Sequence, residues 1–171
     1  MPISPPNAIE IYTVTLFRCG ERFLLLRRGP QKRFAPLRWT GLGGRVEASE
    51  YDDLRASALR EVWEESGITT GEIEHFSFRR VLMTNRPGPA LAIICYFTGD
   101  LQEEKIPSCP EGDLFWLSPG DFESLDIIET TRPVLSLLVE DMHADPEGQN
   151  PVRTGLGVFN AMGEFQGVIW G

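Results

Sequence analysis

The sequence is poor in the residue types that build zinc sites and disulfide frameworks. It has three cysteines and two histidines in 171 residues, and neither type recurs at a metal-binding spacing. Structural zinc sites need four cysteine or histidine ligands, and disulfide-stapled folds use cysteines in even numbers. The counts therefore argue against both classes and indicate reduced thiols in a cytoplasmic protein.

Long apolar runs and an excess of positive charge are also missing. No stretch of eighteen apolar residues is present, and Met1–Asn7 lacks the basic and apolar regions of a signal peptide. The formal net charge is −9, which disfavours polymeric nucleic acid and a membrane surface as partners. A small nucleotide remains compatible with this charge, because a bound metal ion can invert the local field.

One stretch of the sequence, residues 43–68, concentrates acidic residues behind a double glycine. Glu61, Glu64 and Glu65 stand at positions i, i+3 and i+4, which fall within about 100° of one another on a helix. Like charges at this spacing repel each other by a few tenths of a kcal/mol per pair. A hard divalent cation such as Mg²⁺ reverses that repulsion, so the pattern predicts a metal site on one face of a helix.

The same stretch resembles the signature of the Nudix hydrolases. That signature is Gly, five residues, Glu, seven residues, then Arg-Glu-U-x-Glu-Glu-x-Gly-U, where U is a bulky aliphatic residue. One spacing departs from it, because nine residues separate Glu50 from Arg60, and a loop near Tyr51 to Asp53 absorbs the two extra residues cheaply. The matching residues are Gly44, Glu50, Arg60, Glu61, Val62, Glu64, Glu65, Gly67 and Ile68.

The resemblance implies a fold and a metal site. The fold is the Nudix fold, an α/β/α sandwich around a mixed β-sheet, expected as a single domain over residues 1–171 with its signature at residues 44–68. The metal is Mg²⁺, with Mn²⁺ as a substitute. Its ligands are expected to be Glu61, Glu64, Glu65 and the carbonyl of Gly43.

The resemblance also implies a reaction, in which water attacks a nucleoside diphosphate linked to another group. The general base is then one of the signature glutamates, Glu64 or Glu65, or an acid from a later loop. Glu111 is the candidate for that later acid, and Asp113 is its competitor. Arg60 either holds a glutamate in place or contacts a phosphate, and the first role is favoured because bidentate Arg–carboxylate pairing orients a ligand.

Around the signature, the sequence is similar to the MutT-type enzymes. These cleave oxidised purine triphosphates such as 8-oxo-dGTP to the monophosphate and pyrophosphate. The mammalian enzymes of this kind have Asn at the position of Thr40 and tandem aspartates at the positions of Thr130 and Thr131. A threonine hydroxyl cannot present the two-pronged amide pattern that suits a base edge. The expected activity is therefore a triphosphate pyrophosphohydrolase, with the base left open.

Several residues near these positions are candidates for contacting substrate. Trp39, Phe34 and Trp116 are possible stacking platforms for a base, although Trp116 lies in an apolar strand and is better explained as core. Glu129 is the nearest carboxylate that could replace the missing aspartates. The substrate-binding set predicted from the sequence is Trp39, Thr40, Arg45 and Glu129.

The residues leave two other functions open. One is a Nudix hydrolase of a different diphosphate, such as ADP-ribose, a nucleotide sugar or a dinucleoside polyphosphate. The other is a nucleotide-binding module without turnover, which the intact acidic set disfavours. A monomer and a homodimer both fit the sequence.

Hydrophobic periodicity and turn residues predict a chain of mixed α and β structure. The acidic helix is expected from Asp53 to Ser66, with Gly67 as its left-handed cap, and a second helix from Thr131 to Met142. The apolar side of the acidic helix is expected to hold Ala58, Leu59, Val62 and Trp63. Strands are expected at Ile9–Phe17, Phe23–Arg27, Trp39–Val46, Ile73–Met83, Ala90–Gly99, Leu114–Leu117, Leu156–Phe159 and Phe165–Ile169, with a turn at Asn85–Gly88.

Overall fold

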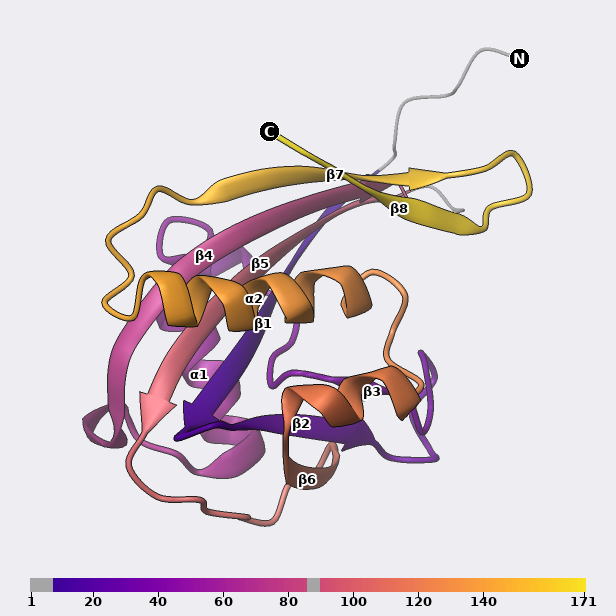
Figure 1. Ribbon diagram of the computed structural model, residues 1–171. Helices are drawn as coiled ribbons and strands as arrows, with labels where there is room; N and C mark the ends of the chain where they lie inside the picture. The colour runs from indigo at the N-terminus through magenta and orange to yellow at the C-terminus, as the bar shows by residue number, and fades with distance from the viewer. Residues whose placement is uncertain (1–7, 86–89) are drawn as a thin grey trace.

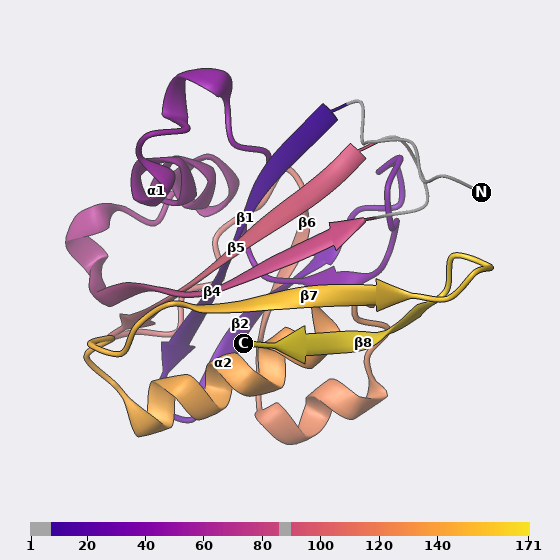
Figure 2. The same ribbon diagram turned by 90° about the horizontal axis from the view of Figure 1, so that it is seen from above.

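A mixed eight-stranded β-sheet runs through the molecule and separates two helical layers (Figures 1 and 2). The computed structural model describes residues 8–85 and 90–171. Helix α1 (Leu54–Ser66) covers one face of the sheet and α2 (Arg132–Ala144) covers the other, which confirms the predicted α/β/α sandwich. The strands are β1 (Ala8–Cys19), β2 (Arg22–Arg28), β3 (Trp39–Thr40), β4 (Ile73–Asn85), β5 (Ala90–Leu101), β6 (Gly112–Leu117), β7 (Arg153–Phe159) and β8 (Phe165–Trp170), and short 3₁₀ helices are η1 (Ala48–Glu50), η2 (Thr70–Glu72) and η3 (Pro119–Ser124).

Two parallel pairings make the sheet mixed. The strand order is β3-β2-β1-β5-β4-β7-β8, and β6 also pairs with β2. β1 runs parallel to β5, with Tyr12 opposite Ile94, and β4 runs parallel to β7. The other pairs of named strands are antiparallel. This order places the first strand of the chain inside the sheet, where segments from both helical layers can reach it.

Each face of the sheet has its own hydrophobic core. On the α1 side, Ala58 and Val62 of the helix pack with Phe17 of β1. On the α2 side, Leu135 and Leu138 are among the helix residues that pack with strand residues. β1 supplies both cores from adjacent positions, because neighbouring side chains of a strand point to opposite faces.

Helix α1 begins and ends where the sequence predicts. The Asp53 carboxylate accepts a hydrogen bond from the N–H of Ala56 at 2.9 Å, which satisfies a free donor of the first turn. Gly67 has a left-handed φ of 69°, and its N–H donates to the carbonyl of Trp63 at 2.7 Å. These two caps fix the length of the helix that carries the acidic residues.

The buried side of α1 differs from the prediction at one position. Ala58 and Val62 are fully buried, as expected, but Trp63 is 60% exposed. Trp63 lies about 100° around the helix from Val62, which turns it toward solvent. The prediction for Trp63 is therefore wrong. The helix also buries polar side chains that the apolar pattern does not indicate, namely Ser57, Glu65 and Ser66.

The segment after β3 is less regular than predicted. The sequence indicates a strand over Trp39–Val46, but regular strand structure covers only Trp39–Thr40. Beyond it, Gly43 has a φ of 151°, and a Cβ at this position would lie 2.0 Å from the carbonyl oxygen of Thr13. The N–H of Thr13 donates to the carbonyl of Gly44 at 2.9 Å. The glycines let this segment run directly against β1, which a residue with a side chain would prevent.

The other predicted elements are confirmed with shifts at their ends. α2 spans Arg132–Ala144, and the terminal hairpin extends over β7 and β8. The parallel pairing of β7 with β4 is not indicated by any local pattern. The predicted turn at Asn85–Gly88 lies, apart from Asn85, outside the described residues, and Met1–Asn7 lies wholly outside them.

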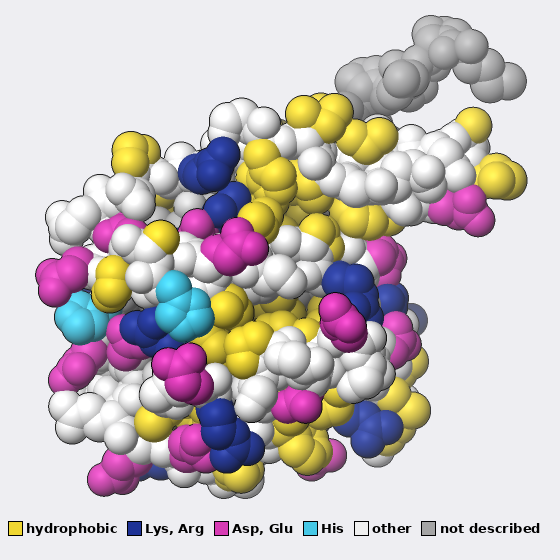
Figure 3. Space-filling model, in the orientation of Figure 1, with side chains coloured by type: hydrophobic (Ala, Val, Ile, Leu, Met, Phe, Trp, Pro, Cys, Tyr) yellow, Lys and Arg dark blue, Asp and Glu magenta, His cyan; other side chains and the backbone are white. Residues whose placement is uncertain are grey.

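The surface that carries α2 mixes charges of both signs. Figure 3 shows Lys and Arg side chains interspersed with Asp and Glu on this face, with hydrophobic side chains visible between the β7–β8 hairpin and the helix. Val168 and Trp170 of β8 pack against the α2-side core. Within residues 8–85 and 90–171, no helix is long and apolar enough to cross a membrane.

A buried ion pair fastens α2 to the sheet. Arg80 of β4 has a side chain only 3% exposed, and its Nε and Nη2 atoms each donate to the Asp141 carboxylate at 2.7 Å. The guanidinium carbon also lies 4.8 Å from the ring centre of Trp170. A guanidinium this deeply buried depends on its carboxylate, because an unpaired buried charge is costly.

We expect Asp141→Ala to lower the free energy of unfolding by about 3 kcal/mol, because it leaves the Arg80 charge buried without a partner. Urea unfolding followed by circular dichroism measures the change. The matched control is Glu140→Ala, which removes an exposed carboxylate from the same helix and should shift stability by less than about 0.5 kcal/mol. Equal effects of the two substitutions would show that the ion pair contributes nothing.

Candidate active site

A cavity of roughly 580 Å³ lies beside the glycine segment. It brings together the predicted metal ligands and the predicted later acid from three parts of the chain. The glycine segment and α1 supply most of them, and the loop before β6 supplies the last. These residues are Gly43, Glu61, Glu64, Glu65 and Glu111.

Glu65 is the most deeply buried of the signature glutamates. The residue is 5% exposed, and its Oε2 accepts a hydrogen bond from the N–H of Gly43 at 2.8 Å. Burial raises the pKa of the Glu65 carboxyl to about 8, and the nearby charges of Glu61 and Glu111 add to the rise, while the Gly43 N–H opposes it. Without a cation, Glu65 is therefore largely protonated at neutral pH.

Glu61 lies directly against the second glycine of the pair. A Cβ built on Gly44 would come within 2.4 Å of Glu61 Oε2, so the carboxylate occupies the space that any other residue would fill. Burial raises the pKa of Glu61, and its hydrogen bond from Arg60 acts in the opposite direction. Gly44 is thus required for the close approach of a metal-ligand candidate to the backbone.

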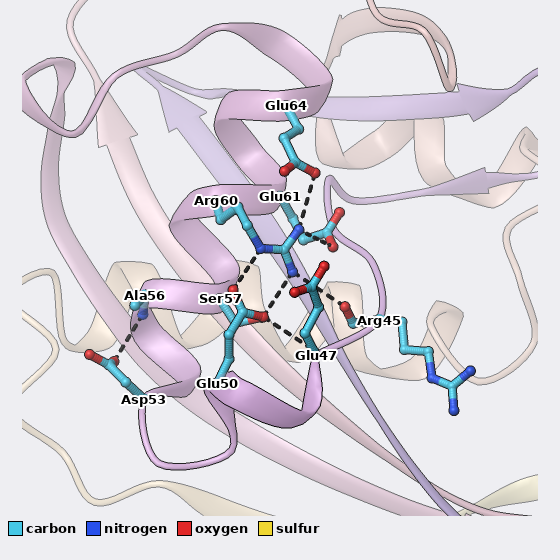
Figure 4. A network of polar contacts seen from close by, with 9 residues as sticks. All are labelled: Arg45, Glu47, Glu50, Asp53, Ala56, Ser57, Arg60, Glu61 and Glu64. Carbon is cyan, nitrogen blue, oxygen red and sulfur yellow. Dashed lines mark hydrogen bonds and ion pairs between the residues drawn. The ribbon is translucent and has the colours of Figure 1, made fainter.

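Arg60 joins the glutamates into one network (Figure 4). Its Nη1 donates to Glu61 Oε1 at 2.8 Å and to Glu64 Oε2 at 3.1 Å. Its Nε donates to Glu50 Oε1 at 2.6 Å, and its Nη2 donates to Glu50 Oε2 at 2.9 Å. Arg60 thus pairs with three carboxylates of the signature, and its orienting role stays a prediction.

The two-residue insertion leaves Glu50 inside this network. Glu50 ends η1, and the turn at Tyr51–Asp53 leads from it into α1. The carboxylate is 17% exposed, and its hydrogen bonds from Arg60 lower the pKa of Glu50 to about 2, with smaller contributions from the Glu47 N–H and the Ser57 hydroxyl. The loop thus absorbs the extra residues, and the contact between Glu50 and Arg60 is made.

The acidic cluster suits a divalent cation by its chemistry. The donors are carboxylate and carbonyl oxygens, which Mg²⁺ and Mn²⁺ prefer. Arg60 already places positive charge between Glu61 and Glu64, and Glu65 carries a buried carboxyl that a cation would help to ionise. In the described part of the chain, no three acidic, histidine or cysteine side chains already converge on one metal position. A cation would therefore draw the glutamates together from contacts that Arg60 now holds.

Glu111 reaches the cavity from the opposite side. The backbone carbonyl of Glu111 accepts a hydrogen bond from the N–H of Gly29 at 2.8 Å, and its carboxylate forms an ion pair with Lys32. Asp113, the competing candidate, is an exposed residue of β6 that pairs in register with Arg27 and is not among the cavity-lining residues. The structure thus favours Glu111 over Asp113 as the acid that faces the signature helix.

Apart from Arg28, the rest of the cavity wall is uncharged. Tyr12 and Ile94 lie opposite each other on β1 and β5, and both belong to the α2 side of the sheet. The backbone carbonyl of Thr130 lies 3.3 Å from the hydroxyl of Tyr96, which ties the loop before α2 to β5. Together these contacts give the cavity a wall of aliphatic, aromatic and hydroxyl groups, which also includes Val14, Thr40, Ile128 and Thr131.

The predicted substrate-binding residues divide into two groups. Thr40 lines the cavity, whereas Trp39, Arg45 and Glu129 are not among its lining residues. Arg45 points away from the network in Figure 4 and forms an ion pair with Glu10 at 3.4 Å. Trp39 packs against the ring of Phe115 at 5.1 Å, and Glu129 is held by Arg38.

Phe34 and Arg28 are among the lining residues outside that predicted set. Phe34 lines the cavity and is 46% exposed, which fits the sequence-based view of it as a stacking platform. Arg28, which the sequence did not single out, also lines it, and its Nε donates to the carbonyl of Phe34 at 3.1 Å. No local motif marks Arg28, because its place depends on how β2 pairs with β3 and β6. Trp116 is 3% exposed and belongs to the core.

We expect the stability difference between wild type and Glu50→Gln to depend on pH. At pH 7 the variant should be less stable by about 1–2 kcal/mol, because the charged hydrogen bonds to Arg60 weaken. The folded-state pKa of Glu50 is about 2, below the ordinary 4.5, so this stabilisation is complete above pH 4.5 and is lost as the pH falls toward 2. Urea unfolding between pH 7 and pH 2.5 tests it.

The control for that experiment is Asp52→Asn, which removes an exposed charge two residues along the chain. Its stability difference from wild type should stay small across the range. A Glu50→Gln difference that did not shrink on acidification would contradict the ion-pair explanation.

Comparison with known proteins places this arrangement in a family. The family model for the NUDIX domain matches residues 8–138. The fold resembles a MutT protein from Bacillus halodurans, with a TM-score of 0.66, 18% identity, and coverage of 94% of this chain and 97% of that one. It also resembles a MutT protein from Methanosarcina mazei Go1, with a TM-score of 0.64, 22% identity, and coverage of 82% and 98%.

A third similar structure is the dihydroneopterin triphosphate pyrophosphohydrolase of E. coli, with a TM-score of 0.62, 20% identity, and coverage of 77% of this chain and 95% of that one. No match was found among curated proteins. Identities this low establish the shared fold, whereas the family model covers most of the chain and includes the whole acidic signature. The chain therefore belongs to the Nudix family and is a hydrolase of phosphorus-containing anhydrides.

Proposed function

We propose that the chain is a Mg²⁺-dependent pyrophosphohydrolase that cleaves nucleoside triphosphates to the monophosphate and pyrophosphate. The observation that carries the proposal is the division of one cavity into a charged part, in which the acidic cluster lies near Arg28, and an uncharged part. A nucleotide has the same division, because its phosphates need cations and its base needs apolar and hydrogen-bonding contacts. The cavity volume of roughly 580 Å³ lies within the usual range of small-molecule sites, about 300–1,000 Å³.

The acidic part would hold the cation through Glu61, Glu64, Glu65 and the carbonyl of Gly43. When bound, Mg²⁺ would neutralise charge on phosphate oxygens and favour the ionised form of a nearby water. The net charge of −9 disfavours the approach of a polyphosphate, and a bound cation would offset that repulsion locally. Arg60 would keep the glutamates oriented, because two of its nitrogens are fixed by hydrogen bonds to Glu50.

We assign the role of general base, which accepts the proton of the attacking water, to Glu111 in preference to the signature glutamates. Glu111 faces the cavity from the loop before β6 and is not required to hold the cation. Lys32 pairs with its carboxylate and fixes its position. Glu64 and Glu65 remain the alternatives, since both line the same cavity.

The uncharged wall would receive the nucleoside. Phe34 offers an exposed ring on which a base can stack, and such stacking contributes about 1–3 kcal/mol per base. Thr40, Thr130 and Thr131 offer hydroxyls, which both donate and accept hydrogen bonds. This composition supports a nucleoside without specifying an oxidised purine, so 8-oxo-dGTP is one of several candidate substrates.

The substrate assignment is tested by a panel in millimolar Mg²⁺ with products separated by chromatography. The panel contains the common NTPs and dNTPs, 8-oxo-dGTP, dihydroneopterin triphosphate, ADP-ribose, a nucleotide sugar and a dinucleoside tetraphosphate. We expect monophosphate and pyrophosphate from triphosphates, and no turnover in excess EDTA. Cleavage confined to ADP-ribose or another diphosphate would replace the proposed substrate class, and tight binding without turnover would indicate a binding module.

The separate roles of Glu65 and Glu111 predict different kinetic results. Glu65→Gln should lower kcat by roughly 100-fold or more and weaken Mn²⁺ binding, because it removes a charged ligand. Its folding should be little changed, since Gln resembles the protonated carboxyl that Glu65 carries at neutral pH without a cation. Glu111→Gln should lower kcat while leaving Mn²⁺ affinity unchanged. Full activity in both variants would refute the assignments.

A further inference from the structure

Ser57 is a buried residue whose hydroxyl, within residues 8–85 and 90–171, has one side-chain partner, an acid of the signature. It lies in the first turn of α1 and is completely buried. Its Oγ donates to Glu50 Oε2 at 2.8 Å, as Figure 4 shows. A serine is an ordinary helix residue with no packing advantage at a buried position, where alanine would avoid burying a hydroxyl. Its presence is explained by the hydrogen bond that it makes.

Three residues donate hydrogen bonds to the Glu50 carboxylate. Arg60 supplies two hydrogen bonds, at 2.6 Å to Oε1 and 2.9 Å to Oε2. The N–H of Glu47 donates to Oε2 at 3.1 Å, and Ser57 donates to the same atom. Among the described residues, Ser57 is the one that connects the carboxylate to α1 independently of the guanidinium. Its hydroxyl therefore helps to fix the position of the Glu50 carboxylate relative to α1 without involving Arg60.

The loop on which Glu50 sits makes this connection necessary. Nine residues separate Glu50 from Arg60, two more than the usual spacing of the signature, and the surplus lies at Tyr51–Asp53 between η1 and α1. A longer connection allows more positions for its first residue relative to the helix. Asp53 fixes the start of the helix through its cap on Ala56, and its backbone N–H donates to the Glu50 carbonyl at 3.0 Å, but neither contact positions the Glu50 carboxylate.

The position of Glu50 affects the metal-ligand candidates through Arg60. Arg60 grips Glu50 with Nε and Nη2, and its Nη1 contacts Glu61 and Glu64. The guanidinium is planar and rigid, so a shift of Glu50 changes the direction of the third nitrogen. Groups that orient metal ligands typically alter metal affinity by about 10–100-fold when removed.

We propose that Ser57 is a positioning residue for the metal-binding glutamates, acting through Glu50 and Arg60 to compensate for the longer loop. The proposal rests on the metal site of the proposed function and adds to it a residue outside the signature. Ser57 is not among the residues that line the cavity, so it would contact neither cation nor substrate. Its effect should therefore appear in the affinity for the cation, with the fold and the chemistry of the site otherwise preserved.

The test is Mn²⁺ titration of the nucleotide-free protein, with free Mn²⁺ measured by electron paramagnetic resonance. We expect Ser57→Ala to raise the Mn²⁺ dissociation constant by about 10-fold, the low end of the range for orienting groups, because the residue acts through two others. The Mg²⁺ concentration for half-maximal activity should rise by a similar factor. The thermal midpoint is measured in parallel.

The matched control is Ser66→Ala on the same helix. Ser66 is also buried, and its Oγ donates to the carbonyl of Val62 at 2.6 Å, without a contact to Glu50 or Arg60. It should leave Mn²⁺ affinity unchanged even where it lowers the thermal midpoint. A loss of affinity that followed the thermal midpoint equally in both variants would reduce Ser57 to a structural residue and overturn the proposal.

A double-substitution cycle isolates the route through Glu50. In a Glu50→Ala background, Ser57→Ala should cause no further loss of Mn²⁺ affinity, because the group it positions is gone. A full additional loss would overturn the proposed route. If the wild-type protein bound no Mn²⁺, the proposed metal site would fail and this inference with it. Binding by wild type that Ser57→Ala left unchanged would overturn the inference alone.

Discussion

The two-point contact between Glu50 and Arg60 is the interaction on which the acidic site depends. Three glutamates on one helical face repel one another, and burial makes their charges costlier still. Arg60 offsets part of this cost by placing a guanidinium among them, but a free arginine could equally turn toward solvent. Glu50 prevents that turn by engaging two of its nitrogens, which leaves the third to face Glu61 and Glu64.

The double glycine has a complementary effect on the other side of the acidic cluster. Gly43 lies where a Cβ would meet the Thr13 carbonyl, and Gly44 lies where a Cβ would meet Glu61. The glycine segment can thus approach the strand and the helix at once, and the Gly43 N–H reaches Glu65. The acidic wall of the cavity forms because the glycine segment has no side chains and lies against α1, which carries the carboxylates.

Local sequence pattern predicts the parts of this structure that are built from neighbouring residues. The spacing of Glu61, Glu64 and Glu65, the caps of α1, and the core positions Ala58 and Val62 all follow from helical geometry. The cavity also brings together Gly43 and Glu111, which the family resemblance singled out, although Glu111 lies far outside the signature and both roles stay predictions. Trp63 shows the limit of such reasoning, since hydrophobicity alone does not decide which side of a helix faces the sheet.

The uncharged wall of the cavity could not be predicted in the same way. Tyr12 and Ile94 meet there because β1 and β5 pair in parallel at one register, and no short motif specifies that register. Trp39, Arg45 and Glu129 are close in sequence to residues that line the cavity, but their side chains make other contacts. Trp39 packs on Phe115, and Arg45 and Glu129 form ion pairs with Glu10 and Arg38. Contacts between distant strands determine this wall, whereas local spacing determines the acidic one.

The parallel pairing of β4 with β7 has a consequence for the order in which the chain folds. Arg80 and Arg153 pair across a long stretch of chain that includes α2, and β1–β5 and β2–β6 are long-range pairs as well. Closing such loops costs entropy before their contacts form. What sets the β7–β8 hairpin apart is its place at one edge of the sheet and after α2 in the chain, so it can be added to β4 last, after α2 has packed on β4 through Arg80 and Asp141. The acidic signature lies entirely before this step, so the helix and glycine segment can assemble while the far edge of the sheet is still open.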